Sequence, residues 1–275
     1  MKDRPLNAYP VYQKLFESKP KERREMKSKF LLMVSVLVIL SLALGACSAG
    51  AGAKPKVRVA TEAAYPPFET VDEATKELVG YDIELMNAIA AKAGFEVEFQ
   101  NTPFDAVLAG MATCQFDAAV SAITITAERG EKMSFSDPYI NAGQVTTVRI
   151  DNTDIKGPAD LKGKTIGVQL STTGQIEAEK IEGATIKPYD SVDLAFLDLA
   201  NGQVDAVVAD YPTTLNFVNK SADKIKVTGD VFTEESYGIA VCKTNTELLQ
   251  KINKAIAALK EDGTLKKLEE KWLAK

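Results

Sequence analysis

Strands and helices alternate through residues 164–218, and this alternation limits the folds that the chain can adopt. Short apolar runs rich in β-branched residues are separated by segments of helical character, and the order strand–helix repeats three times. Strands that are joined through helices lie parallel in one sheet. A pattern of the same kind comes earlier in the chain, with strands expected at 56–61 and 95–99. The sequence therefore predicts an α/β protein with two α/β units.

Residues 80–94 predict an amphipathic helix between these first two strands. Four apolar side chains fall on one helical face: Ile83, Met86, Ile89 and Ala90. Asp82 is suited to cap the start of the helix, and Gly94 is suited to end it. A further helix is expected to begin at Pro103, because proline is favoured at the first helical position.

The stretch Ser121–Arg129 combines groups that bind an anion. It follows the apolar run 118–120, which predicts a buried strand. Small ligands bind at the strand ends of open α/β sheets. A guanidinium at such a place can hold a carboxylate through two parallel hydrogen bonds, and the hydroxyls of Ser121 and Thr124 add neutral donors. The alternative is an edge strand with a surface arginine.

Residues 26–46 have the build of a secretory signal peptide. Lys27 and Lys29 precede an apolar run that ends in small residues. The alternative is a membrane-spanning helix, since the run is near the lower length limit for spanning. Residues 1–25 fit no part of a signal peptide, and we interpret them as a misassigned start or a long leader. Residues 47–53, which are rich in small side chains, are expected to form a flexible tether.

The composition excludes several classes of function. The chain contains no histidine, so histidine-based catalysis and His-ligated metal sites are excluded, and we expect neither a metal nor a cofactor. Residues 1–46 hold nine of the 33 Lys and Arg and four of the 38 Asp and Glu, so the remaining chain has a net charge near −10. Nucleic-acid binding needs a basic face and is therefore not expected. Cys114 and Cys242 are interpreted as small buried hydrophobes, although a bridge between them remains open.

Several motifs, taken together and in order, resemble one known family. They match over residues 54–275: Gly80–Ala93, Ala60–Glu69, Ile123–Thr126, Glu128–Arg129, Phe135–Tyr139, Leu161–Lys164 and Gly263–Thr264. The chain is similar to the extracytoplasmic solute-binding proteins of polar amino-acid ABC importers, bacterial family 3. In addition, Leu44–Cys47 resembles the bacterial lipobox, in which the cysteine is lipidated and becomes the mature N-terminus. A diacyl modification fits an anchoring role, because a single acyl chain holds a protein only marginally.

The resemblance implies a fold, partners and a location. The fold is the type II periplasmic-binding-protein fold, in which two α/β lobes are joined by two hinge strands. The first lobe would comprise 54–142 and 238–275 and the second 143–237, with hinges near 141–145 and 235–239. One amino acid binds in the cleft and the lobes close on it. The implied partners are ABC transporter permease subunits and, through the lipid anchor, the outer face of the cytoplasmic membrane; we expect a monomer.

The resemblance also assigns roles within the cleft. Arg129 is expected to hold the ligand α-carboxylate, with help from three residues of the same stretch: Thr124 and the backbone of Ser121 and Ala122. In the second lobe, Thr172 and Thr173 match the family's threonine pair, and N–H groups at a helix N-terminus face the same carboxylate. Asp210 is expected to accept the α-ammonium, whereas the alternative is a turn or helix-cap aspartate.

A basic amino acid is the expected ligand, with arginine first and lysine or histidine next. Glu62 stands where the family places an acid toward the ligand side chain. Gln169 stands where glutamine-selective relatives tend to carry a lysine, which would repel a guanidinium. Tyr65 and Phe104 are expected to sandwich a flat guanidinium, although both are also suited to core packing. The alternative ligand is glutamine, whose amide can use Glu62 and Gln169.

Two other classes of function compete with a transport receptor. The same fold hosts cyclohexadienyl dehydratases, but such an enzyme needs a general acid over the substrate, and Ser171–Gly174 contains no acidic residue. A sensory input domain needs a downstream transmembrane segment and a signalling domain, and neither follows before Lys275. We therefore expect a receptor with no chemistry of its own.

Overall fold

The computed structural model describes residues 54–273, which belong to one compact unit, Lys54–Lys275. The predicted leader, signal peptide, lipidation site and tether, residues 1–53, lie outside the described residues. Among the helices of the described part, none has both the length and the apolar composition that crossing a bilayer requires.

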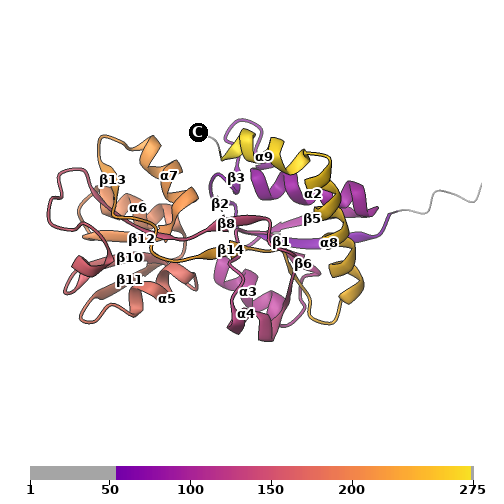
Figure 1. Cartoon of the computed structure of the whole chain (residues 1–275), viewed down its shortest axis with the longest axis horizontal. Helices are drawn as coiled ribbons and strands as arrows, with labels where there is room; N and C mark the ends of the chain where they lie inside the picture. The colour runs from indigo at the N-terminus through magenta and orange to yellow at the C-terminus, as the bar shows by residue number, and fades with distance from the viewer. Residues whose placement is uncertain (1–53, 274–275) are drawn as a thin grey trace, which may run out of the picture. The chain divides into compact units, whose positions relative to one another are not determined.

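The first lobe is built on a five-stranded sheet in the order β5-β1-β6-β15-β7. Its strands are β1 (Lys56–Thr61), β5 (Glu96–Asn101), β6 (Ala118–Ala119), β7 (Ser134–Phe135) and β15 (Ala240–Val241). Helices lie on both faces (Figure 1), with α2 (Tyr81–Ala93), α8 (Thr246–Glu261) and α9 (Thr264–Trp272) opposite α3 (Phe104–Ala112) and α4 (Ala127–Lys132). Val59 belongs to the hydrophobic cluster of α2 and Ala60 to that of α3, because successive strand side chains point to opposite faces.

The second lobe is built on a sheet in the order β11-β10-β12-β9-β13. Its strands are β9 (Gln144–Arg149), β10 (Thr165–Gln169), β11 (Thr185–Tyr189), β12 (Ala206–Asp210) and β13 (Ile225–Thr228). Its helices are the short 3₁₀ helix η2 (Pro158–Leu161), α5 (Thr173–Glu179), α6 (Val192–Ala200) and α7 (Tyr211–Lys220). Val207 of β12 clusters with side chains of α6 and Val208 with Ala178 of α5, so this sheet is also covered on both faces.

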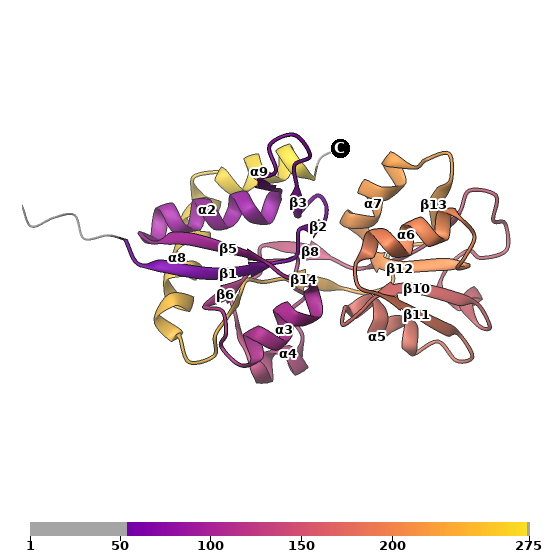
Figure 2. The same ribbon diagram turned by 180° about the vertical axis from the view of Figure 1, so that it is seen from behind.

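Two antiparallel strands, β8 (Ile140–Ala142) and β14 (Glu235–Tyr237), run between the two lobes (Figure 2). β8 leads through Gly143 into β9 of the second sheet, and β14 leads into β15 of the first. A small sheet of β2 (Ala64–Tyr65), β3 (Glu69–Val71) and β4 (Leu78–Val79) follows β1. The chain therefore passes between the lobes twice, as the predicted fold class requires.

Both sheets are mixed, because each contains a strand that no helix joins to its neighbours. β9 runs antiparallel to β12 and β13, and β15 runs antiparallel to β6 and β7. β9 and β15 continue from the two crossing strands, so they enter their sheets from the hinge and not through a helical crossover. The pairs β1–β5 and β10–β11, which helices do connect, are parallel as predicted.

Helix α2 has its predicted buried face but not its predicted start. All four apolar residues of that face are buried or nearly so: Ile83, Met86, Ile89 and Ala90. Gly94 ends the helix in the left-handed conformation, with φ 80°. The N-cap is Gly80 and not Asp82. A glycine is needed there because a Cβ atom at this position would lie 2.1 Å from the carbonyl oxygen of Phe68. Asp82 is instead fully buried and belongs to a polar network behind the cleft.

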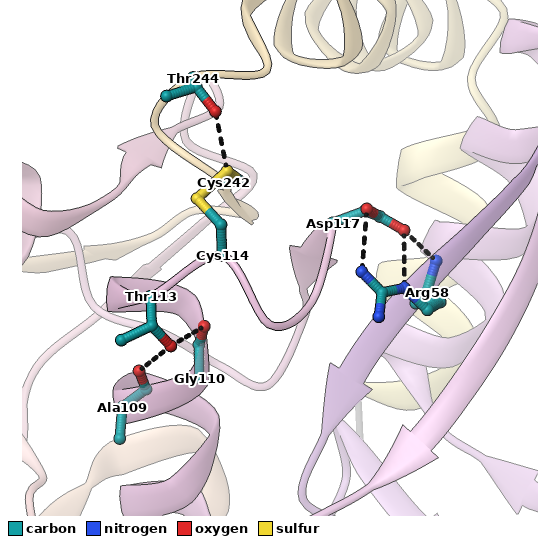
Figure 3. Close-up of a disulfide and its surroundings, with 8 residues drawn as sticks. All are labelled: Arg58, Ala109, Gly110, Thr113, Cys114, Asp117, Cys242 and Thr244. Carbon is teal, nitrogen blue, oxygen red and sulfur yellow. Dashed lines mark hydrogen bonds and ion pairs between the residues drawn. A yellow bond between two sulfur atoms is a disulfide. The ribbon is translucent and has the colours of Figure 1, made fainter.

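Cys114 and Cys242 form a disulfide, with Cα atoms 5.0 Å apart (Figure 3). Their interpretation as small hydrophobes is therefore wrong. The bridge forms because β15, which precedes Cys242, pairs with β6, the strand that follows Cys114. It joins residues 128 positions apart, and in the chain-entropy account a loop of about this size destabilises the unfolded state by about 5 kcal/mol.

Candidate functional site

The ends of four strands, β1, β6, β10 and β12, meet between the two lobes. They and the adjoining loops line one pocket with all but one of the residues that the sequence predicts: Tyr65, Phe104, Ser121, Ala122, Thr124, Arg129, Gln169, Thr172, Thr173 and Asp210. The remaining predicted residue, Glu62, follows β1 and contacts Gln169 of this set. The fold therefore brings the predicted residues together at one place.

Arg129 lies on α4, a helix that the sequence analysis did not predict. Thr126 caps this helix, since its hydroxyl accepts the backbone N–H of Arg129 at 3.1 Å. The buried guanidinium donates to the carbonyl of Thr124 at 2.8 Å and, across the cleft, to the carbonyl of Ser171 at 3.0 Å. Burial lowers the pKa of Arg129, and the Phe104 ring lies 5.6 Å from its guanidinium carbon. The alternative of a surface arginine on an edge strand is wrong.

Asp210 is the last residue of β12 and is buried. Its carboxylate accepts hydrogen bonds from the hydroxyl of Tyr65, in the first lobe, and from the side-chain amide of Gln144. Burial and, secondly, the charge of Glu235 raise the pKa of Asp210 to about 7. The charge of Arg129 acts weakly in the opposite direction, and no cationic side chain among residues 54–273 forms a salt bridge with Asp210. The carboxyl group is therefore suited to receive a cationic group.

Glu62 and Gln169 form a second polar contact across the cleft. The amide nitrogen Nε2 of Gln169 lies 2.6 Å from Oε2 of Glu62. Burial raises the pKa of Glu62 to about 7, although the hydrogen bond from Gln169 opposes this effect. The cleft therefore contains two acceptor positions, one at Asp210 and one at Glu62, that a cationic group can occupy.

A buried carboxyl pair, Glu69 and Asp82, supports the stretch around Ser121 from behind. The Ser121 hydroxyl donates to Glu69 at 2.8 Å, and the N–H of Ala122 donates to Asp82 at 2.7 Å. Burial raises the pKa of Asp82 to about 7, and burial and then the charge of Asp82 raise the pKa of Glu69 well above its usual range. Among residues 54–273, Glu69 Oε2 and Asp82 Oδ1 meet no donor.

This network corrects the expected role of two groups, the Ser121 hydroxyl and the Ala122 N–H, as ligand donors. Both donate to protein carboxyls, so they position the stretch rather than donate to a carboxylate in the pocket. The backbone N–H of Ser121 stays a predicted ligand donor. Ala122 has a φ of 45°, a left-handed conformation that is unusual for a residue with a Cβ atom. The hydrogen bond to Asp82 holds the backbone in this conformation.

Thr172 and Thr173 begin helix α5. The Thr172 hydroxyl caps the helix by accepting the N–H of Gln175 at 3.2 Å, and it donates to the carbonyl of Gln169 at 2.7 Å. Thr173 is buried, and its hydroxyl faces Thr124 of the first lobe at 3.4 Å.

The sequence analysis missed two polar residues of the cleft, Gln144 and Glu235. Glu235 begins β14, and its Oε2 accepts hydrogen bonds from the hydroxyls of Thr124 at 2.8 Å and Thr173 at 2.7 Å. Gln144 begins β9 and donates from Nε2 to Asp210 and, at 3.1 Å, to Glu235. Both lie in the predicted hinge segments, so polar residues in those segments were the available signal.

Comparison with known proteins establishes the family. The family described as "Bacterial extracellular solute-binding proteins, family 3" matches residues 57–275. The chain belongs to this family. Members of this family have the type II periplasmic-binding-protein fold. The two lobes and the two crossing strands of this chain agree with that fold.

Related proteins include receptors named for different amino acids. The L-cystine-binding protein TcyJ of Escherichia coli (strain K12) is 35% identical over 216 residues, covering 78% of this chain and 81% of that protein. ABC transporter arginine-binding protein 1 of the same strain is 37% identical over 224 residues, covering 79% and 90%. A solved structure of an ancestral arginine-binding protein bound to arginine has a TM-score of 0.77 at 43% identity, covering 80% of this chain and 98% of that one. An ancestral arginine-binding protein bound to glutamine also scores 0.77 at 43% identity, with 81% and 99% covered.

We expect the free energy of unfolding of the unliganded domain to increase as the pH falls from about 8 to about 5. Glu62, Asp82 and Asp210 have pKa values of about 7 in the folded state, above their ordinary values of 4.5, 3.8 and 3.8. The folded state therefore binds more protons than the unfolded state in this interval, and each extra proton adds about 1.4 kcal/mol per pH unit. Urea unfolding at several pH values measures the slope.

Two variants provide the controls for this slope. Glu62→Gln removes one titrating group and should make the slope shallower. Glu247→Gln removes a carboxylate on α8 whose side chain is 78% exposed, so it should leave the slope unchanged. A stability that rises with pH across the same interval would contradict the burial of these carboxyls as neutral groups.

Proposed function

We propose that this protein is the substrate-binding receptor of an amino-acid ABC importer, and that it binds a basic L-amino acid, arginine before lysine and histidine. The observation that carries the proposal is the charge in the cleft. Three carboxyl groups, those of Glu62, Asp210 and Glu235, lie with the guanidinium of Arg129 among the described residues at the site. A ligand with one carboxylate and two cationic groups complements this set better than a ligand with a single cation.

Arg129 and Asp210 bind the amino-acid end of the ligand in this proposal. Arg129 has five N–H donors and uses two of its nitrogens on backbone carbonyls, which fixes the guanidinium plane in the cleft. Asp210 offers a buried acceptor whose present donors, Tyr65 and Gln144, are neutral. A buried charge that loses its partner costs about 3–5 kcal/mol, so a ligand that lacks the α-carboxylate or the α-ammonium is discriminated against.

Glu62 binds the side chain of the ligand. Its carboxyl group accepts from the neutral amide of Gln169, and a guanidinium or ammonium supplies a stronger, charge-assisted donor. Tyr65 and Phe104 line the pocket, and we retain them as the aromatic walls of the side-chain site. Glutamine is the second candidate ligand, since its amide can pair with Glu62 and Gln169 and a related ancestral protein binds it.

The proposal assigns no chemistry to the protein. A pKa near 7 would also suit a general acid, as in a dehydratase. The raised pKa values of Glu62 and Asp210 arise first from burial, and both groups have binding roles here. The relatives compared above are named as binding proteins, which supports a receptor over an enzyme.

Partners and location follow from the family and from the N-terminal sequence. As a monomeric extracytoplasmic receptor, the protein would deliver its ligand to the permease subunits of its transporter. Leu44–Cys47 supports export with a signal peptide at 26–46 and a lipid anchor on Cys47. The mass of the membrane-extracted protein should correspond to a lipidated chain that begins at Cys47, and Cys47→Ala should abolish that product. Another mature N-terminus would contradict the anchor.

Arginine should bind the wild-type domain more tightly than glutamine, and Glu62→Gln should reverse much of this preference. The neutral variant loses a charged pair with arginine and should weaken its binding by about 1.5–3 kcal/mol. Glutamine binding should change little. Titration calorimetry with both ligands at equal salt measures the two affinities.

Glu247→Gln serves as the control, because it removes the same charge from an exposed position. If wild-type protein binds glutamine more tightly than arginine, the choice of ligand is wrong while the receptor function stands. If no amino acid raises the melting temperature in a thermal-shift screen, the receptor function itself is contradicted.

A further inference from the structure

Glu235 contacts polar groups of both lobes from its position on the crossing strand β14. Its carboxylate accepts the hydroxyls of Thr124 (2.8 Å, first lobe), Thr173 (2.7 Å, second lobe) and Thr233 (2.9 Å). Its other close donor is the amide of Gln144 at 3.1 Å. A single carboxylate therefore connects the facing walls of the cleft.

These contacts determine whether the hydroxyls of Thr124 and Thr173 can donate or accept a hydrogen bond toward a ligand. A threonine hydroxyl has one proton, and an ionised carboxylate has none to give. Thr124 and Thr173 therefore donate to Glu235, and each oxygen keeps only its acceptor capacity toward other groups. The two oxygens lie 3.4 Å apart and belong to residues that line the pocket. They are suited to accept from a cation rather than to donate to a carboxylate.

The amide of Gln144 links this arrangement to Asp210. Its Nε2 atom has two protons and three acceptors within hydrogen-bond distance: the carboxylates of Asp210 and Glu235 and, at 3.1 Å, the hydroxyl oxygen of Thr173. The opposite orientation of the amide would place its oxygen against two carboxylates, so electrostatics fixes the nitrogen toward them. Asp210, Gln144 and Glu235 thus form one connected acceptor network.

We propose that Glu235 is a positioning residue for ligand recognition, which orients the hydroxyls of Thr124 and Thr173 as acceptors for the α-ammonium beside Asp210. Arg129 is then the side-chain donor for the α-carboxylate, and Thr124 changes from the expected donor to an acceptor. Because one hydroxyl comes from each lobe, this acceptor set is complete only when the lobes are closed. The inference rests on the proposed function as an amino-acid receptor.

The test compares two ligands on Glu235→Gln: L-arginine and 5-guanidinopentanoate, which is arginine without its α-ammonium. Thr124 and Thr173 both donate to Oε2 of Glu235, whereas Gln144 and Thr233 donate to Oε1. In the glutamine variant, an amide nitrogen at the first position removes the acceptor of both cleft threonines, and at the second position it opposes the amide of Gln144, so either placement breaks the acceptor network. Arginine should bind about tenfold or more weakly, whereas the affinity of the analogue should change less than about threefold. Glu234→Gln is the matched control, because it removes the same charge from the exposed neighbouring residue. The proposal is overturned if the affinities for both ligands fall by the same factor, or if the control variant loses a similar share of its affinity for arginine.

Thr173→Val provides a second test that leaves the charge of Glu235 in place. It removes one acceptor and should weaken the binding of arginine more than the binding of the analogue. In the double variant with Glu235→Gln, both changes act on the same hydroxyl, so the combined loss should fall at least threefold short of the product of the single losses. This cycle uses arginine alone and decides the case if the analogue binds too weakly to titrate. If the loss of affinity in the double variant equals the product of the two single losses, the proposed role of Glu235 in orienting this hydroxyl is overturned.

The screen of wild-type protein separates this inference from the proposed function. If glutamine is the ligand, the comparison uses glutamine and glutaramate, its analogue without the α-ammonium. If the wild type binds no amino acid, the proposed function fails. If it binds one and Glu235→Gln weakens ligand and analogue alike, only the role of Glu235 fails.

Discussion

The structure depends on the burial of carboxyl groups around one buried guanidinium. Glu62, Glu69, Asp82 and Asp210 are each at most 5% exposed, and Arg129 is the buried cation among the described residues. Water cannot solvate these charges, so the protein reduces their free energy through hydrogen bonds from neutral donors and through bound protons. Glu69 and Asp82 are fully buried and support the backbone of the site, whereas Glu62 and Asp210 border the cleft. A basic amino acid in the cleft would therefore place a cationic group beside Glu62 and another beside Asp210, but none beside the fully buried pair.

The crossing strands connect this electrostatic arrangement to the two-lobed fold. Gln144 and Glu235 come from β9 and β14, at the two places where the chain passes between lobes. Their side chains bond to groups of both walls, so the hinge contributes directly to the chemistry of the cleft. Closure also excludes water, which strengthens each charged hydrogen bond to a ligand. Recognition and closure would therefore involve the same set of polar contacts.

The α/β class and the stretch Ser121–Arg129 could be predicted because they depend on local patterns, whereas the other pocket residues were assigned through the family resemblance. The buried face of α2 follows from helical periodicity, and the place of Arg129 follows from the apolar run that ends just before Ser121. Asp210 ends a strand of the other sheet, and the two meet only because the lobes face each other. The errors concern partners that are distant in sequence. Asp82 resembles a helix cap until the backbone of Ala122, 40 positions away, is placed beside it. The bridge between Cys114 and Cys242 and the contacts of Glu235 depend in the same way on strand pairings that no local pattern encodes.

Proton release on binding is the most direct measure of whether a cationic ligand completes this cleft. Glu62 and Asp210 both have a pKa of about 7 without ligand, so each is about half protonated at pH 7. A cation beside each carboxyl group lowers both pKa values, and binding should release the protons. Titration of the wild-type domain with L-arginine at pH 7, in buffers of different ionisation enthalpy, should therefore show release of about one proton per ligand bound. Arginine binding with no proton release, or with proton uptake, would contradict the account.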